Sequence, residues 1–183
     1  MDNGAGSYRR FLAGDDEGLY EIICQYRTGL MLYLNSFVQN IRTAEELTED
    51  TFSELAIKCP KYSGKSSFKT WLYAIGRNIT AKYLRKHTKF DIVPLESQEY
   101  IADEESLEGN YIKTEQKRAV HHALHNLKTE YRQVLYLSYF EGFSNEETAI
   151  IMNKSKRQIE TLLYNGRKAL KNELERSGFE YEN

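Results

Sequence analysis

The sequence predicts an all-α protein of two small helical modules joined by an acidic, flexible linker, with a helix-turn-helix in the C-terminal module. Three observations predict this class. Apolar residues recur at three- and four-residue steps in both halves of the chain, and strand-like alternation is nearly absent. Capping-box sequences precede several of these stretches. The segment between the two halves holds one basic residue and eight acidic ones.

The composition of the 183 residues excludes several classes of protein. Hydrophobic residues make up 40%, which is enough to form a core, so the chain is not disordered overall. Two cysteines, Cys24 and Cys59, cannot build a disulfide framework and lack zinc-type spacing, which favours reduced structural thiols. No apolar run approaches the roughly 20 residues of a membrane span. Residues 1–14 lack the apolar region of a signal peptide. We therefore expect a cytoplasmic protein without membrane insertion.

The net charge of −2 conceals an uneven distribution. Residues 1–90 carry +3, residues 91–116 carry −7 and residues 117–183 carry +2. Between Lys58 and Lys89 there are nine basic residues and no acid, with five aromatic residues interleaved. A basic run is often only a solvated face, but the absence of any compensating acid favours a polyanionic partner. We expect an N-terminal domain at 1–90, a linker at 91–116 and a C-terminal domain at 117–183.

Two helices are predicted before the basic run. Asp15 and Asp16 can cap the first, whose apolar side comprises Leu19, Ile22, Ile23, Tyr26 and Leu30. A capping box at residues 43–46 (TAEE) begins the second, whose apolar stripe is Leu47, Thr51, Phe52 and Leu55. Pro60 ends this helix at or before Cys59, because the residue before a proline avoids the helical region.

A polar turn at residues 62–67 precedes a third, amphipathic helix. Its apolar stripe extends over about four turns and consists of Phe68, Trp71, Leu72, Ile75, Ile79 and Tyr83. The complementary face is strongly cationic and carries Lys69, Arg77, Lys82, Arg85 and Lys86. Trp71 fits two roles equally well, as a core residue or as a ring that stacks on a base.

The C-terminal module is predicted to contain a helix-turn-helix. Two helices come first, the earlier with Val120, Ala123, Leu124 and Leu127 and the later with Tyr131, Val134, Leu135 and Ser138. Gly142 can end the later one in a left-handed conformation. Capping boxes at 144–147 (SNEE) and 155–158 (SKRQ) then begin two helices separated by a short turn.

Details of the second pair of helices support the motif. Asn153 stands in the turn, where a left-handed residue is needed, and Ala149 is small where the helices cross. The last helix is expected to bury Ile159, Leu162, Leu163, Gly166 and Leu170. Its outer face is expected to carry Lys156, Arg157, Glu160, Thr161, Tyr164 and Lys168. Residues 154–171 hold six basic groups and one acid, which favours a DNA-binding helix over an ordinary helical hairpin.

Catalytic signals are weak. His121, His122 and His125 share one predicted helix, but no HExxH motif, nearby cysteine or acidic partner accompanies them. Residues 63–66 (SGKS) lack the upstream glycine and strand of a phosphate-binding loop. We expect no enzyme activity, metal site, cofactor or small-molecule substrate, and a metal-dependent hydrolase is only a third hypothesis.

Several stretches resemble bacterial sigma-70-type RNA polymerase sigma factors. The compact size and two-module layout are similar to those of the extracytoplasmic-function (ECF) group. The resemblance covers roughly residues 10–90 and 118–175. It is carried by residues 44–52 (AEELTEDTF), 67–78 (SFKTWLYAIGRN), 82–86 (KYLRK) and the C-terminal helix-turn-helix with 144–149 (SNEETA).

The resemblance implies partners and roles. The partners are core RNA polymerase, through its clamp helices and flap, promoter DNA and an anti-sigma factor. Residues implied in polymerase docking are Glu46, Glu49, Asp50 and Phe52. Residues implied in contacts with the melted −10 element are Tyr62, Ser63, Lys65, Ser67, Lys69, Arg77, Asn78, Lys82, Arg85 and Lys86. Residues implied in −35 recognition are Ser155, Lys156, Arg157, Gln158, Glu160, Thr161, Tyr164, Arg167 and Lys168.

Two alternatives stay open from the sequence. The chain could be a stand-alone helix-turn-helix regulator with an N-terminal sensing or dimerisation module. Glu160 is the second open point, since a carboxylate in the major groove can accept from cytosine while Arg157 donates to guanine. In the other interpretation Glu160 only pairs with Arg157 or Lys156 on its own helix.

Overall fold

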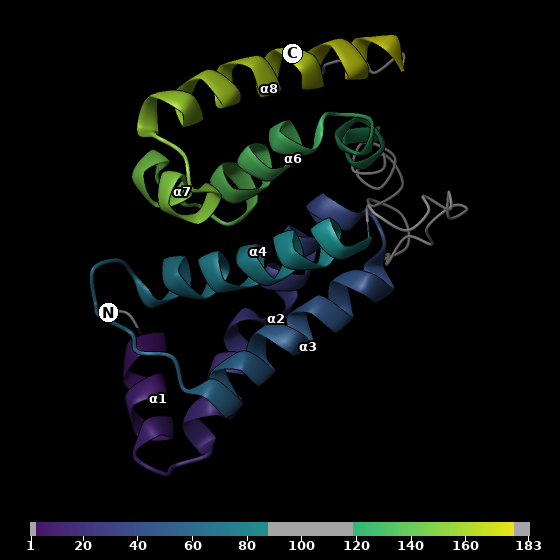
Figure 1. Cartoon of the computed structure of the whole chain (residues 1–183). Coiled ribbons are helices and arrows are strands. Elements are labelled where there is room, and N and C mark those ends of the chain that lie inside the picture. Colours follow the sequence, from purple (N-terminus) through teal and green to yellow (C-terminus); the bar gives the residue numbers. More distant parts are fainter. Residues whose placement is uncertain (1–2, 88–118, 178–183) are drawn as a thin grey trace, which may run out of the picture.

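All regular elements in the described residues, 3–87 and 119–177, are helices (Figure 1). The computed structural model thus confirms the all-α class. The linker predicted at residues 91–116 lies outside the described residues. No helix in the two described ranges is long and apolar enough to span a bilayer.

The N-terminal module is built around α2. Its helices are α1 (Asn3–Leu12), α2 (Glu17–Val38), α3 (Ile41–Lys58) and α4 (Phe68–His87). Helix α2 packs against the other three, and its Ile22, Leu30 and Leu34 are fully buried. The apolar stripe predicted for α3 is confirmed, because all four of its members are buried. Helix α1 was not predicted from the sequence.

The C-terminal module lies on α4 and forms the upper layer in Figure 1. It contains a helical segment at 119–125, α6 (Thr129–Leu135), a one-turn π-helix η1 (Tyr136–Phe140), α7 (Asn145–Met152) and α8 (Lys156–Arg176). Both predicted capping boxes are present, Ser144 with Glu147 and Ser155 with Gln158. Asn153 has the predicted left-handed conformation (φ 52°), as does Gly142 (φ 69°). The helix-turn-helix is therefore formed as predicted.

One predicted cap is wrong and another is confirmed only in part. The capping box at residues 43–46 does not begin α3, because the helix starts at Ile41 and Asn40 is its N-cap. The Asn40 side chain accepts a hydrogen bond from the Thr43 amide (3.0 Å), which places Thr43 inside the first turn. For α2, the Asp15 side chain accepts from the Glu17 amide (3.2 Å), whereas Asp16 makes no side-chain cap.

Helix α4 fully buries only part of the predicted stripe, namely Phe68 and Leu72. Its buried residues are Phe68, Thr70, Leu72, Tyr73, Gly76 and Thr80. Trp71, Ile75, Ile79 and Tyr83 are only partly buried, although they pack against the core. The buried face is rotated because α4 contacts the C-terminal module as well as α2 and α3. A helix packed between two layers buries residues on more than one side, so its sequence does not show a single apolar stripe.

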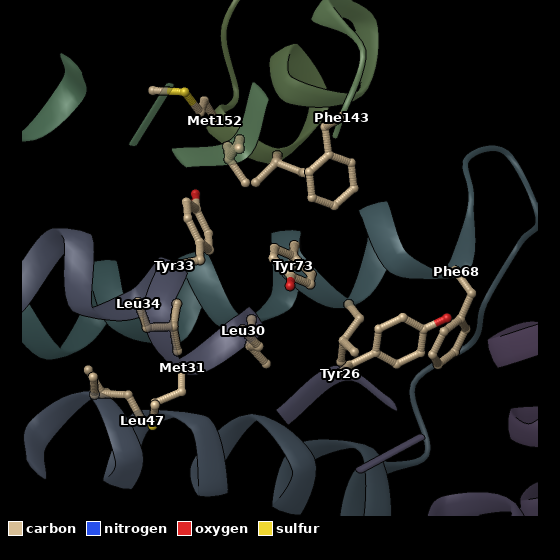
Figure 2. Packing of buried hydrophobic residues seen from close by; sticks show 14 of the residues in the cluster. Tyr26, Leu30, Met31, Tyr33, Leu34, Leu47, Phe68, Tyr73, Phe143 and Met152 are labelled. Carbon is tan, nitrogen blue, oxygen red and sulfur yellow. The ribbon is translucent and has the colours of Figure 1, made fainter. Parts of the chain in front are cut away.

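One hydrophobic cluster extends through both modules. Figure 2 shows Phe143 and Met152 of the C-terminal module facing Tyr33 and Tyr73 of α2 and α4. The Tyr73 and Phe143 rings meet edge to face at 5.1 Å, and Tyr136 stacks 6.5 Å from Tyr33. The modules are thus packed together through buried aromatic rings.

Arg132 joins the modules on a second side. Its guanidinium is buried and donates to the Ser36 carbonyl at the end of α2 (3.0 Å). It also donates to the His125 and Leu127 carbonyls and to the Thr129 hydroxyl within its own module. Burial lowers the pKa of Arg132, and the helix-end carbonyls it bonds favour its positive charge.

Replacing Gly166 of α8 with Ala is expected to stabilise the protein by about 0.5–1 kcal/mol, because Gly costs that much in a helix interior. A methyl group there would lie 3.4 Å from Leu135 Cγ, an ordinary contact. Gly18 of α2 is the control, since its methyl group would lie 2.2 Å from the Ser7 carbonyl oxygen and should destabilise. Urea unfolding measures both changes, and a destabilised Gly166→Ala variant would contradict the α8 packing.

Candidate nucleic-acid interface

The outer face of α8 is the first candidate surface. All nine residues predicted for −35 recognition are exposed. Ser155 and Gln158 are bonded to each other's backbone amides in the capping box, so they fix the start of the helix. In Figure 1, α8 lies on the side of its module that faces away from α4. The face is therefore open to a large ligand such as a DNA groove.

Charged groups on this face differ in their partners. Lys156 pairs with Glu146 of α7, and this contact raises the pKa of Lys156. Glu160 forms no ion pair with either Lys156 or Arg157 in the described part of the chain. The predicted pairing of Glu160 within its helix is thus not seen as a direct contact. Glu160 is exposed one turn from the exposed Arg157, so both side chains are accessible to a ligand.

A second basic surface lies at the C-terminal end of α4. Lys82, Arg85 and Lys86 are exposed there. A groove of about 500 Å³ separates this end from α3 and is lined by Asp50, Lys82 and Lys86. The structure therefore brings a residue predicted for polymerase docking next to two residues predicted for DNA contact. Ile57, also on this groove, is 81% exposed.

The predicted docking residues separate into two groups. Glu46, Glu49 and Asp50 are exposed on one side of α3, and Glu46 pairs loosely with Arg42 at 3.9 Å. Phe52 is different, because it is only 6% exposed and belongs to the core. We conclude that Phe52 supports α3 from inside and offers little surface to a partner.

The loop before α4 forms one wall of a wider groove. Ser63 and Lys65 are exposed, whereas the Tyr62 hydroxyl donates to the Ser66 carbonyl (2.5 Å). The groove, about 1450 Å³, lies between this loop and helices α1 and α2. Tyr62 and Ser63 line it together with Arg9 of α1, a helix that the sequence did not predict. The sequence does carry a signal for α1, because Tyr8, Phe11 and Leu12 stand at helical spacing. The pattern covers only these few residues, which is too short to predict a helix.

Trp71 is partly buried and packs against the core. Its ring lies 5.4 Å from Tyr8, 5.4 Å from Phe68 and 5.2 Å from Tyr62, so three rings surround it. The Tyr8 hydroxyl donates to the Pro60 carbonyl (2.8 Å), and burial raises the pKa of Tyr8 to about 12. These contacts hold the loop against α1. The packing of Trp71 against three rings favours the core role over the base-stacking role.

The first turn of α4 is covered by the C-terminal module. Lys69 is 30% exposed, and its ammonium pairs with the Glu141 carboxylate at 2.9 Å and donates to the Glu141 carbonyl at 2.9 Å. The Ser67 and Thr70 hydroxyls donate to the Glu147 carboxylate at 3.3 and 3.1 Å. Sequence reasoning missed Glu141 altogether and assigned Glu147 only to its capping box. We call these five residues the inter-module contact.

Glu147 lies between two helix N-termini. Its second oxygen accepts from the Ser144 amide (3.0 Å) and hydroxyl (2.9 Å) at the start of α7. Partial burial raises the pKa of Glu147, but hydrogen bonds from Ser144, Thr70 and Ser67 outweigh it, so the net pKa is lowered. The positive ends of both helix dipoles favour the same ionised form.

The exposed histidines and acids do not gather into a metal centre. In the described residues, no group of three His, Cys, Asp or Glu side chains could hold a metal ion. His122 and His125 are exposed on the helical segment 119–125, and the His125 carbonyl accepts from the Gln39 amide group (2.7 Å). The helix thus contributes to module packing through its backbone.

Comparison with known families gives two matches. Residues 22–90 match the model described as Sigma-70 region 2, and residues 117–170 match the model described as Sigma-70, region 4. The two matches fall on the N-terminal and C-terminal modules and together cover about two thirds of the chain.

Curated relatives extend over nearly the whole chain. The RNA polymerase sigma factor YlaC of Bacillus subtilis is 26% identical, over 88% of this chain and 94% of its own length. The ECF sigma factor SigM of the same species is 28% identical, over 82% and 91%. The ECF sigma-E factor of Haemophilus influenzae is 23% identical, over 91% and 92%.

Two solved structures share the fold. The sigma factor RpoE from Bartonella quintana, in complex with the anti-sigma factor NepR, has a TM-score of 0.67 and 24% identity, covering 85% of this chain and 96% of its own. CnrH, in complex with the cytosolic domain of CnrY, has a TM-score of 0.64 and 20% identity, covering 94% and 95%.

Replacing Glu147 with Gln should lower stability at neutral pH and have little effect in acid. Because the folded pKa is lowered, the ionised carboxylate stabilises the fold above the unfolded pKa, about 4.3, and this stability is lost as the pH falls through the folded pKa. Thermal unfolding of both forms at neutral pH and below about pH 4 measures the difference. A difference that stays constant with pH would contradict the ionised state of Glu147.

Proposed function

The chain belongs to the sigma-70 family of RNA polymerase sigma factors, in the ECF group, and from this we propose how its residues carry out promoter-specific initiation. It acts as a dissociable subunit that binds core RNA polymerase and directs it to promoters. The observation that carries this function is the match of both modules, in order, to sigma regions 2 and 4. Membership of this family implies an initiation factor without enzymatic chemistry, and we propose that the chain catalyses no reaction of its own.

We assign a different role to each exposed surface. The exposed face of α8 contacts the −35 element in duplex form, where phosphate contacts fix position and base-edge contacts give specificity. The α4 helix and the loop before it hold the melted −10 strand through their cationic and polar side chains. Glu46, Glu49 and Asp50 of α3 dock on the clamp helices, while the flap contacts the C-terminal module. The α8 face, the docking residues of α3 and the C-terminal end of α4 are exposed, which supports their assignments, whereas Ser67, Lys69 and Arg77 are only partly exposed.

An anti-sigma factor is proposed as a regulatory partner. Support comes from the solved RpoE, whose complex contains the anti-sigma factor NepR. We also propose that the chain acts in the cytoplasm, where core polymerase and chromosomal DNA are found. A stand-alone helix-turn-helix regulator is not favoured, because the relatives that match over most of their length are sigma factors.

Run-off transcription tests the function. Core polymerase from the same bacterium, mixed with this chain and genomic fragments, should produce promoter-specific transcripts that core alone does not. Asp50→Lys should weaken association with core polymerase without changing the fold, because Asp50 is exposed on the proposed docking side of α3. The matched control is Asp16→Lys, which makes the same charge change at an exposed residue before α2.

Two results would contradict this proposal. Equal core affinity of Asp50→Lys and the wild type in a pull-down titration would remove the docking role of Asp50. Absence of any sigma-dependent transcript, together with palindrome-specific binding of the chain alone to duplex DNA, would favour the stand-alone regulator.

Replacing Glu160 with Ala distinguishes base recognition from mere electrostatics. If Glu160 accepts a hydrogen bond from cytosine beside Arg157, the substitution should weaken the free energy of binding to the preferred promoter by about 1–3 kcal/mol. It should also relax selectivity at one base pair. Glu175→Ala on the same helix removes the same charge near its C-terminal end and is the control. A promoter library would measure both. Uniformly tighter binding to all sequences, with no change at any single position, would refute base recognition by Glu160.

A further inference from the structure

An ion pair joins the two helices of the helix-turn-helix at the end where the −35 face begins. The ammonium of Lys156, the first residue of α8, pairs with the carboxylate of Glu146, the second residue of α7. Both side chains are more than half exposed, at 55% and 60%. The contact lowers the pKa of Glu146. Sequence reasoning placed Lys156 on the −35 face and gave Glu146 no role of its own.

The fold does not require a cation at position 156. A positive charge at the N-terminal end of a helix is unfavourable, because the positive end of the helix dipole lies there. The capping boxes of both helices use other side chains, Ser144 with Glu147 and Ser155 with Gln158. Glu146 therefore offsets a charge that the local structure does not favour, which indicates a role for Lys156 in ligand binding.

Two acids compete for the Lys156 ammonium. The pKa of Lys156 is raised first by its bond to Glu146 and further by the charge of Glu160, one turn farther along α8. Lys156 and Glu160 have the i,i+4 spacing of a helical ion pair, which would occupy both side chains. In the described residues Lys156 is instead paired with Glu146. Glu160 is thus left accessible, and the ammonium is held at the N-terminal end of α8.

The docking geometry of the motif places this end of α8 near the bases. A helix-turn-helix inserts the N-terminal residues of its second helix into the major groove, while its first helix crosses the DNA backbone. A lysine there can donate to O6 and N7 of guanine, which gives specificity, or to a phosphate oxygen, which does not.

Glu146 favours the base over the phosphate. A lysine side chain has many rotamers, so a partner that restricts it reduces the entropy lost when it binds in that orientation. The ammonium keeps further hydrogens to donate to a base while it is bonded to Glu146. The carboxylate lies on the helix that crosses the backbone, where its negative charge repels phosphates from the same position.

We propose that Glu146 is a positioning residue for −35 specificity, which holds Lys156 toward the acceptor edge of a guanine and away from the DNA backbone. The proposal rests on the −35 role proposed for α8. It adds a residue of the first helix of the motif to those that determine which promoters the polymerase selects.

Glu146→Gln in the full chain, bound to core polymerase, tests this role. Glutamine keeps the size of the side chain, leaves the capping box of Ser144 and Glu147 intact and removes the charge that holds Lys156. Glu175→Gln on α8 is the matched control, since Glu175 is 53% exposed and also faces a lysine, Lys171, at 3.7 Å. Circular dichroism and thermal unfolding establish that both variants are folded.

Selection from a promoter library with a randomised −35 element is the first measurement. The wild type and the control should prefer guanine at the position that Lys156 contacts. Glu146→Gln should lose about tenfold in selectivity at that one base pair, a loss within the range of a single base contact. Lys156→Met should lose the same preference, and adding Glu146→Gln to it should change nothing further.

The salt dependence of binding is the second measurement, made on a duplex with a scrambled −35 element. With Lys156 released to the backbone, the slope of log affinity against log salt concentration should become steeper by about 0.9, the value for one added phosphate contact. The control should keep the wild-type slope, because Glu175 lies near the other end of α8. A residue that only stabilises α7 would change neither this slope nor the guanine preference.

The outcomes separate the role of Glu146 from the function of the chain. An unchanged guanine preference in Glu146→Gln would overturn the proposal, and a steeper slope alone would leave Glu146 as a charge that weakens binding to every sequence. A further loss of selectivity when Glu146→Gln is added to Lys156→Met would show that Glu146 does not act through Lys156. A wild-type holoenzyme that selects no −35 sequence would refute the proposed function itself.

Discussion

The arrangement of the two modules depends on one buried carboxylate. Glu141 is placed among apolar and aromatic groups of both modules, where an ionised side chain is costly unless it is fully bonded. Lys69, Tyr73 and Tyr136 supply those bonds, and they come from α4 and η1. This requirement fixes how η1 lies on α4. The pKa values of Tyr73 and Tyr136 are both raised. Burial is the larger cause, and the nearby Glu141 carboxylate raises both pKa values further.

Signals that act within a few residues were predictable from the sequence. Both capping boxes of the helix-turn-helix, the left-handed Asn153 and the buried stripe of α3 depend on neighbours in the chain, and each is found where expected. The exposure of the α8 residues followed from the same periodicity. The predicted start of α3 was wrong for a related reason. Asn and Thr are both good N-cap residues, and the sequence pattern does not decide between Asn40 and Thr43.

Features that depend on distant contacts were not predictable. The buried face of α4 is set by two layers of helices, so Tyr73 faces Phe143 and Lys69 faces Glu141, residues about 70 positions later in the chain. Phe52 had two assignments from the sequence, a buried position on the apolar stripe of α3 and a docking role implied by the resemblance, and its burial agrees with the first. In the π-helical turn at Tyr136–Phe140, Tyr136 contacts both Glu141 and Tyr33. No local sequence motif predicts this turn.

The two kinds of contact between the modules have different consequences for function. Aromatic packing around Phe143 and Tyr73 is apolar and stabilises closure without regard to charge. The carboxylate bonds to Ser67, Lys69 and Thr70 are polar, and water or phosphate can replace each of them when the modules separate. Breaking them therefore costs less than their number suggests, because every donor released is a donor that a DNA strand can use.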